Sequence, residues 1–162
     1  MREEILRETT IQSSTDLQET TAKEPFLAVL RELAQAYHAF SAYSATHVRQ
    51  LGLTPAQFDV IATLGNTQGM PLTQLAQKTL ITKGTLTGII DRLDEKGLVR
   101  REVPVGDRRS FRAVLTPEGE VIFSRVFPAH IAYLSRVFAN VDAGDLEQVR
   151  RTLRALRDRF QE

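Results

Sequence analysis

A short stretch of the sequence, residues 82 to 96, combines hydroxyl, basic and glycine positions on one face of an expected helix. The helix should begin at Thr82, whose hydroxyl can cap free backbone N–H groups, and should end at Lys96 before Gly97. Its apolar residues follow the spacing i, i+3, i+4 and i+7 and must face a core: Leu86, Ile89, Ile90 and Leu93. The opposite face and its flanks carry small, polar and charged residues: Lys83, Gly84, Thr85, Thr87, Gly88, Asp91 and Arg92.

The two glycines on this face indicate that another molecule approaches it. A glycine inside a helix costs about 1 kcal/mol relative to alanine, so a purely structural helix does not favour Gly84 and Gly88. Hydroxyl groups beside ammonium and guanidinium groups are suited to contacts with bases and phosphates. The alternative is an ordinary solvated helix surface, which is the more common arrangement for a helix taken at random.

The residues after this helix favour the first interpretation. Two β-rich runs, residues 98–103 and 110–115, are joined by residues 104–109, which read as a long polar hairpin tip. Residues 75–115 are therefore predicted to form a winged helix-turn-helix.

Charge is concentrated in the same region. The whole chain has a net charge of +1, whereas residues 70–116 contain nine basic and five acidic residues. A polyanion such as duplex DNA is attracted to such a region. A charge run alone is often only a solvated face, so its coincidence with the motif carries the argument.

Length and composition exclude several classes of protein. The 162 residues, 42% of them hydrophobic, suffice for one substantial core. The absence of cysteine excludes disulfides, thiolate metal sites and cysteine redox switches, and neither a metal nor a cofactor is expected. No apolar run approaches the roughly 20 residues that span a bilayer, and no secretory signal is recognisable, so a cytoplasmic protein without membrane contact is expected.

Histidines offer the main argument for an enzyme, and it is weak. His38 and His47 are nine residues apart and so lie on opposite faces of one helix, while His130 stands alone in the sequence. No common hydrolase, nucleotide-binding or zinc-protease motif is present, and a non-enzyme is predicted. A winged-helix adapter that binds protein instead of DNA remains open, and salt-dependent binding to random duplex would distinguish the two.

The remaining elements are expected to be mainly helical. Residues 1–23 are predicted to be a loose arm, 24–52 a long amphipathic helix, 54–116 the winged lobe, and 117–162 two further helices. Start signals stand at Thr54-Pro55, Thr116-Pro117 and Asp142. The last helix has a coiled-coil-like seam formed by Leu146, Val149, Leu153, Leu156 and Phe160. The terminal helices are expected to pack against each other and against a second copy of the chain. The fold class is thus mainly α with a small β-wing.

From Glu24 onward the chain resembles the MarR family (multiple-antibiotic-resistance-type) of bacterial regulators. The most specific resemblance is Asp107-Arg108-Arg109-Ser110 followed by Leu115-Thr116-Pro117-Glu118-Gly119, which is similar to the family's D-x-R-S/A and L-T-x-x-G signature. Lys83-Gly84-Thr85-Leu86-Thr87, Asp91-Arg92-Leu93 and Gly97-Leu98-Val99 also resemble its helix-turn-helix pattern. The resemblance implies a homodimeric DNA-binding regulator, in most cases a repressor, that acts on a palindromic operator.

The resemblance also implies roles for particular residues. The helix from Thr82 would enter the major groove, with Thr85 and Thr87 at the bases and Lys83 and Arg92 at phosphates. At the tip of the wing, Arg108 would touch phosphate and Arg109 would enter the minor groove, held by Asp107. A small aromatic or phenolic effector would release the DNA. Side chains of the long N-terminal helix that could hold it are Tyr37, His38, Tyr43, His47 and Arg49.

Overall fold

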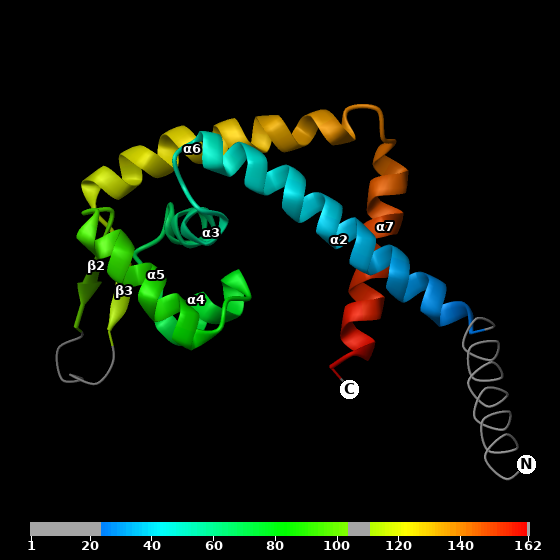
Figure 1. Ribbon diagram of the computed structural model, residues 1–162, viewed down its shortest axis with the longest axis horizontal. Coiled ribbons are helices and arrows are strands. Elements are labelled where there is room, and N and C mark those ends of the chain that lie inside the picture. The colour runs from blue at the N-terminus through cyan, green and yellow to red at the C-terminus, as the bar shows by residue number, and fades with distance from the viewer. Residues whose placement is uncertain (1–23, 104–110, 162) are drawn as a thin grey trace, which may run out of the picture. The chain divides into compact units, whose positions relative to one another are not determined.

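The computed structural model describes residues 24–103 and 111–161 (Figure 1). The chain forms two compact units, residues 1–43 and 44–162, and the division falls within helix α2 (Pro25–Gln50). Each unit is described by itself. In the first unit the described residues belong almost entirely to α2, and several large apolar side chains on it are exposed: Phe26, Val29, Leu30, Tyr37 and Phe40.

The second unit holds a winged helix-turn-helix lobe and two further helices. Its elements after the last turns of α2 are α3 (Pro55–Leu64), β1 (Met70–Pro71), α4 (Leu72–Thr79), α5 (Lys83–Glu95), β2 (Val99–Glu102), β3 (Arg112–Leu115), α6 (Pro117–Phe138) and α7 (Ala143–Arg159). The predicted mainly helical fold with a small wing is confirmed.

The three strands form one antiparallel sheet in the order β1-β3-β2. Val99 pairs with Leu115 and Glu102 with Arg112, so β2 and β3 form the base of the predicted hairpin. Met70 pairs with Ala113, which places the short strand β1 on the other side of β3. Strand β3 of the wing therefore pairs with β1, which directly precedes α4.

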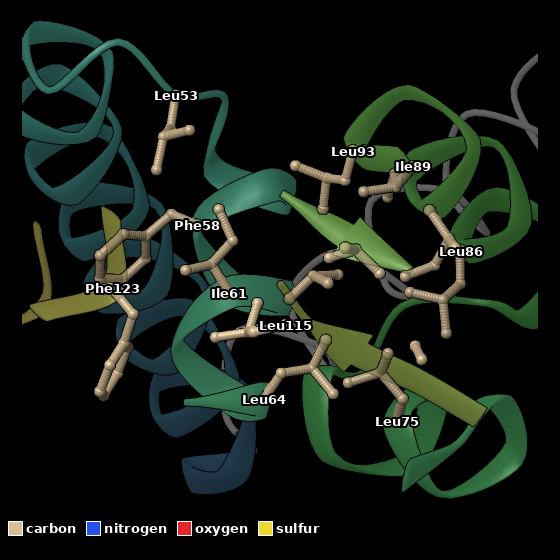
Figure 2. Packing of buried hydrophobic residues seen from close by; sticks show 14 of the residues in the cluster. Leu53, Phe58, Ile61, Leu64, Leu75, Leu86, Ile89, Leu93, Leu115 and Phe123 are labelled. Atoms are coloured by element: carbon tan, nitrogen blue, oxygen red, sulfur yellow. The ribbon is translucent and has the colours of Figure 1, made fainter. Parts of the chain in front are cut away.

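Buried apolar side chains of the described residues form a hydrophobic core between α3, α4, α5 and the sheet, to which Val48 of α2 and Phe123 and Val126 of α6 also belong (Figure 2). All four residues of the predicted apolar stripe on α5 are buried, and Leu86, Ile90 and Leu93 have no exposed surface. They pack with fully buried residues of neighbouring elements, among them Ile61 and Leu75. Complete burial of such side chains stabilises a fold by about 1.5–3 kcal/mol each, which fixes the face that α5 turns outward.

The helix starts predicted from the sequence are made by side-chain caps. Thr54 and Gln57 form a reciprocal capping box at α3. Thr116 caps α6 by accepting a hydrogen bond from the Gly119 N–H at 3.0 Å, and its hydroxyl donates to the Gly97 carbonyl at 2.6 Å. A Cβ at Gly119 would overlap the Leu98 carbonyl oxygen. This close approach explains the glycine in the L-T-x-x-G sequence.

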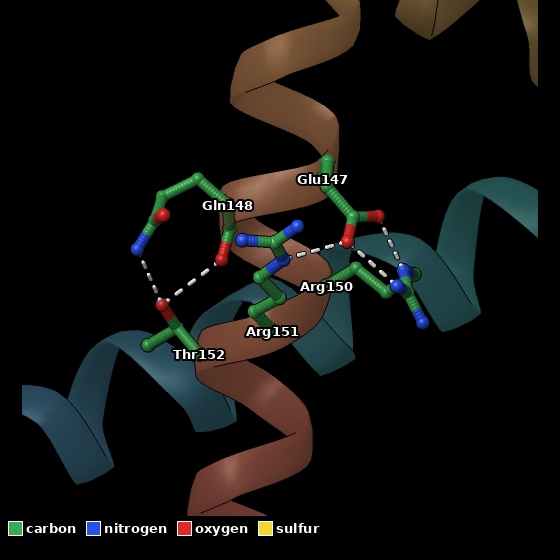
Figure 3. A network of polar contacts seen from close by, with 5 residues as sticks. All are labelled: Glu147, Gln148, Arg150, Arg151 and Thr152. Atoms are coloured by element: carbon green, nitrogen blue, oxygen red, sulfur yellow. Dashed lines mark hydrogen bonds and ion pairs between the residues drawn. The ribbon is translucent and has the colours of Figure 1, made fainter.

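Helix α7 has no buried residue in the described chain. Its predicted cap is present, since Asp142 accepts from the Gly144 N–H at 2.7 Å. On one side, Glu147 accepts hydrogen bonds from Arg150 and Arg151, which lower the pKa of its carboxyl (Figure 3). The predicted seam lies largely exposed, with Val149 56% and Phe160 66% exposed.

None of the described helices is both long enough and apolar enough to span a membrane.

Candidate nucleic-acid interface

The N-terminus of α5 is exposed to solvent and is capped by the Thr82 side chain. Thr82 accepts from the Thr85 N–H at 3.4 Å, and its own hydroxyl donates to the Thr85 hydroxyl at 3.0 Å. Lys83 follows as the first residue of the helix, and the first turn contains no acidic residue. The positive end of the helix dipole and the Lys83 ammonium group therefore act together, as a phosphate contact requires.

The two threonines on the exposed face offer different groups to a ligand. The Thr87 hydroxyl donates to the Lys83 carbonyl at 3.1 Å, so its proton is used within the helix. What remains of Thr87 is a methyl group and an acceptor oxygen. The Thr85 oxygen accepts from Thr82, which leaves the Thr85 proton free to donate. Thr85 is thus equipped to donate to a base acceptor such as guanine or thymine oxygen, and Thr87 to touch a thymine methyl group.

The packing of the protein requires neither glycine on this face. A Cβ built on Gly84 or Gly88 would meet no atom within 4 Å. By contrast, a Cβ on Gly65 would overlap the ring of Phe123, so that glycine is explained by the core. Gly84 and Gly88 therefore lower the stability of α5, and no close packing contact within the protein compensates for this. They also leave the backbone of the exposed face accessible to another molecule.

An ion pair connects α5 to the wing. The Asp91 carboxylate pairs with the Arg101 guanidinium of β2, and Arg101 also lies 4.9 Å from the ring centroid of Phe111. Asp91, which the sequence placed on the outward face, is therefore used to fix the wing against the helix. Arg101 was missed by sequence reasoning, because no local pattern signals a partner on another element.

The other cations at the base of the wing are engaged within the protein. Arg100 pairs with Glu102 at 2.7 Å, and Arg112 donates to the carbonyls of Gln68 and Gly69 at 3.1 and 2.8 Å. Lys83 and Arg92, in contrast, are exposed and form no ion pair within the described chain. They are the described cations of α5 that remain free for phosphates.

The predicted contacts of the wing tip, Asp107, Arg108 and Arg109, lie outside the described residues. Their roles remain predictions.

The structure corrects the isolated position assigned to His130. His130 Nδ1 lies 3.0 Å from His47 Nδ1, and its Nε2 lies 3.0 Å from the Ser44 hydroxyl. His130 is only 2% exposed. Burial, and then the neighbouring charge of His47, lower the pKa of His130. The two histidines are 83 residues apart in the sequence, so helical spacing could not reveal the contact.

The predicted effector residues are divided between the two units. His47 is half-buried beside His130, and Arg49 is exposed. Tyr37, His38 and Tyr43 belong to the first unit, in which Tyr37 and His38 are exposed. A common effector site formed by these side chains remains a prediction.

Comparison with known proteins settles the family. The model of the MarR family matches residues 51–110, which contain the helix-turn-helix. The regulator MhqR of Bacillus subtilis is 28% identical over 124 residues, which cover 76% of this chain and 86% of MhqR. The homoprotocatechuate degradative operon repressor of Escherichia coli is 33% identical over 93 residues, 57% of this chain and 63% of the repressor. The chain belongs to the MarR family of transcriptional regulators.

Solved structures of MarR regulators share its fold. AbsC of Streptomyces coelicolor is 26% identical with a TM-score of 0.75, over 83% of this chain and 93% of AbsC. NadR, solved in complex with 4-hydroxyphenylacetate, is 25% identical with a TM-score of 0.66, over 79% and 91% of the two chains. Sco3205 of Streptomyces coelicolor, solved in complex with DNA, matches in fold with a TM-score of 0.76 at 23% identity, over 84% and 88% of the chains. AbsC and Sco3205 are described as MarR family transcriptional regulators.

Proposed function

We propose that this MarR-family chain is a homodimeric repressor that binds a palindromic operator in double-stranded DNA and releases it when a small aromatic molecule binds. The observation that carries DNA binding is the outward face of α5. A buried stripe holds the helix in place, while the opposite face offers a capped N-terminus, the unused hydroxyl proton of Thr85, free cations and two glycines that the protein itself does not need. These are the features of a helix that enters the major groove.

Exposed apolar side chains on the last helices support a homodimer. The C-terminal half of α6, helix α7 and the residue after it expose several large apolar side chains: Ile131, Val137, Phe138, Leu146, Val149, Leu153 and Phe160. So many exposed apolar side chains are costly in water and are typical of a subunit interface. A two-fold dimer with one recognition helix in each chain requires two half-sites about 10 bp apart.

An aromatic effector is supported by relatives. NadR has been solved with 4-hydroxyphenylacetate, and another relative is named for a homoprotocatechuate degradative operon. We extend this class of small phenolic acid to the present chain, with Tyr37, His38, Tyr43, His47 and Arg49 as the side chains proposed to hold it. An effector that weakens DNA binding tenfold must prefer the released form by about 1.4 kcal/mol.

We also propose that the chain is not an enzyme. Ser44, His130 and His47 form a hydrogen-bonded row in the order of a nucleophile, a base and an orienting group. However, Ser44 lies inside α2, where the surrounding backbone N–H groups are used by the helix and cannot stabilise an oxyanion. A regulator of operator DNA would act in the cytoplasm.

The alternative function is a winged-helix adapter that binds protein and leaves its basic surface unused. Binding of the full chain to random duplex at several salt concentrations separates the two. A DNA-binding protein should lose affinity linearly in log K against log salt, with a slope near −0.9 for each phosphate contact. An adapter should show no measurable binding at any salt concentration, and that result would reject the proposed function.

A further inference from the structure

Two histidines on different helices share a hydrogen bond in the second unit, and we call them the histidine pair. His47 lies in the last turn of α2, and His130 lies in the second half of α6. Their Nδ1 atoms are 3.0 Å apart, and the second nitrogen of His130 is 3.0 Å from the Ser44 hydroxyl. Both ring nitrogens of the buried His130 are therefore engaged.

Aromatic rings surround the pair. His47 stacks on Tyr133 with ring centroids 4.2 Å apart and an interplanar angle of 4°. Phe58 of α3 meets His130 edge-on, with ring centroids 4.6 Å apart. The pair thus lies where α2, α3 and α6 meet, and water has almost no access to His130, which is 2% exposed.

No counter-charge compensates the pair within the described residues. On α2 the pair contacts the neutral Ser44, and on α3 it contacts Phe58. The charged residues near these contacts in the sequence, Arg49 and Asp59, are exposed. On α6, Tyr133 stacks on His47, and Arg136 lies 5.8 Å from the Tyr133 ring centroid. Within residues 24–103 and 111–161, neither imidazole forms an ion pair with a carboxylate.

The hydrogen bonds limit how many protons the pair can hold. With both rings neutral, one Nδ1–H donates to the other Nδ1, and the Ser44 hydroxyl accepts from or donates to Nε2 of His130. One added proton is tolerated on either ring, because a single Nδ1–H can still donate to the Nδ1 lone pair of the other ring while Nε2 of His130 keeps its hydrogen bond with Ser44. A second added proton leaves two N–H groups facing each other at 3.0 Å between like charges, and neither has an acceptor.

We propose that the histidine pair is a proton-sensitive latch that holds the end of α2 against α6 and α3 with up to one added proton and opens when both rings are protonated.

Opening of the latch has a consequence for DNA binding, and this step rests on the proposed function. Helix α6 continues directly from strand β3 of the wing through Thr116, and α3 packs in the core behind α5. The latch therefore connects the last turn of α2 to elements that position the recognition helix. Its loss should uncouple α2 from the winged lobe and lower DNA affinity as the solution becomes acidic.

The direction of this effect is diagnostic. Acid adds positive charge to a protein, and positive charge strengthens binding to the DNA polyanion in general. A fall in affinity on acidification therefore runs against the general trend and requires a specific device such as the latch.

The first experiment follows the imidazole nitrogens of the full-length protein by NMR without DNA, from about pH 8 to pH 5. We expect His130 to take up a proton only below its ordinary pKa, with signals of α2 and α6 changing as it does so. Protonation of His130 at its ordinary pKa, with no change in the helix signals, would overturn the latch. This experiment needs no variant and no ligand.

The second experiment measures affinity for a duplex selected from a random pool, across the same pH range and at constant salt. His47→Phe keeps an aromatic ring for Tyr133 and removes the nitrogen, whereas Glu32→Gln removes an exposed titratable group of α2 outside the pair and serves as the control. We expect the wild type and the control to lose about tenfold or more in affinity on acidification, and His47→Phe to bind as tightly or more tightly in acid. If all three proteins bind more tightly in acid, the latch does not govern DNA binding.

The two experiments distinguish failure of the latch from failure of the proposed function. A lowered pKa of His130 with opening of the helices on protonation, in a protein that binds no duplex at any pH, would support the latch and reject the proposed function. Normal DNA binding with no latch titration would do the reverse.

Discussion

The Asp91 carboxylate of the recognition helix α5 is paired with the Arg101 guanidinium of strand β2, so the wing and the helix are joined by their own side chains. Both groups are partly exposed, at 48% and 33%, and a pair of this kind stabilises a fold by less than about 1 kcal/mol. We therefore expect Arg101→Ala to change the free energy of unfolding little and to reduce DNA affinity more. In a double-mutant cycle on affinity, Asp91→Ala combined with Arg101→Ala should be no worse than Arg101→Ala alone. Additive losses would show that the pair does not align the wing.

The glycines of α5 should separate stability from binding. Gly84→Ala and Gly88→Ala meet no neighbouring atom, so each should raise the free energy of unfolding by up to about 1 kcal/mol while weakening DNA binding. Gly119→Ala is the matched control, because its Cβ would overlap the Leu98 carbonyl and should destabilise the protein. Urea unfolding and duplex titration of the same samples measure both effects. Unchanged DNA affinity in both α5 variants would mean that nothing approaches this face closely.

Cations on the helix and on the wing should differ in their effects. Lys83→Ala should weaken binding to all duplex sequences alike and reduce the salt slope by about 1, since Lys83 is free and at the helix N-terminus. Arg109→Ala is expected to cost more, because a guanidinium in a narrow minor groove gains from the concentrated negative potential. Asp107→Ala should partly reproduce that loss. Normal affinity of a folded Arg109→Ala protein would refute the assignment of the wing.

Acid should destabilise the fold through His130. Burial, followed by the charge of His47, lowers the pKa of His130 in the folded protein from its ordinary value of 6.5. Just below that pH the unfolded chain binds more protons than the folded one, so stability is complete above about pH 6.5 and is lost as pH falls. Urea unfolding at several pH values gives the free energy of unfolding as a function of pH. Below about pH 6.5, the slope of this curve should be smaller in His130→Gln than in the wild type, by up to about 1.4 kcal/mol per pH unit. An unchanged slope would mean that His130 does not contribute.

The exposed seam of α7 should hold two chains together. Leu153 is 48% exposed in the single chain and lies at the centre of the seam, so Leu153→Glu should break the dimer without changing the core of the winged lobe. Sedimentation of the wild type should give twice the chain mass, and the variant a single chain with weaker DNA binding. Glu147→Gln is a control on the polar side of α7 and should remain dimeric. A monomeric wild type on and off DNA would contradict the dimer.

Features governed by neighbours along the chain were predictable from the sequence. The stripe of α5, its cap at Thr82 and the capping box at Thr54 follow from spacing and from the residue types at helix ends, and the structure has each of them. Contacts between distant residues were not predictable. Asp91 with Arg101, and His47 with His130, meet only after the helices and strands have packed, so His130 was wrongly taken to stand alone.

The candidate site shows the same division. Helical spacing was enough to place Thr85, Thr87 and Gly88 on the outward face. Only the hydrogen bonds in the structure show that the Thr87 hydroxyl donates within the helix and that the Thr85 hydroxyl proton does not.

Selection of duplexes from a random pool by the full-length protein tests the central claim most directly. The account predicts enrichment of a pseudo-palindrome whose half-sites lie about 10 bp apart, bound by two chains and at least about a thousandfold more tightly than random duplex at physiological salt. Enrichment of no sequence, or of a single asymmetric site bound by one chain, would contradict the account.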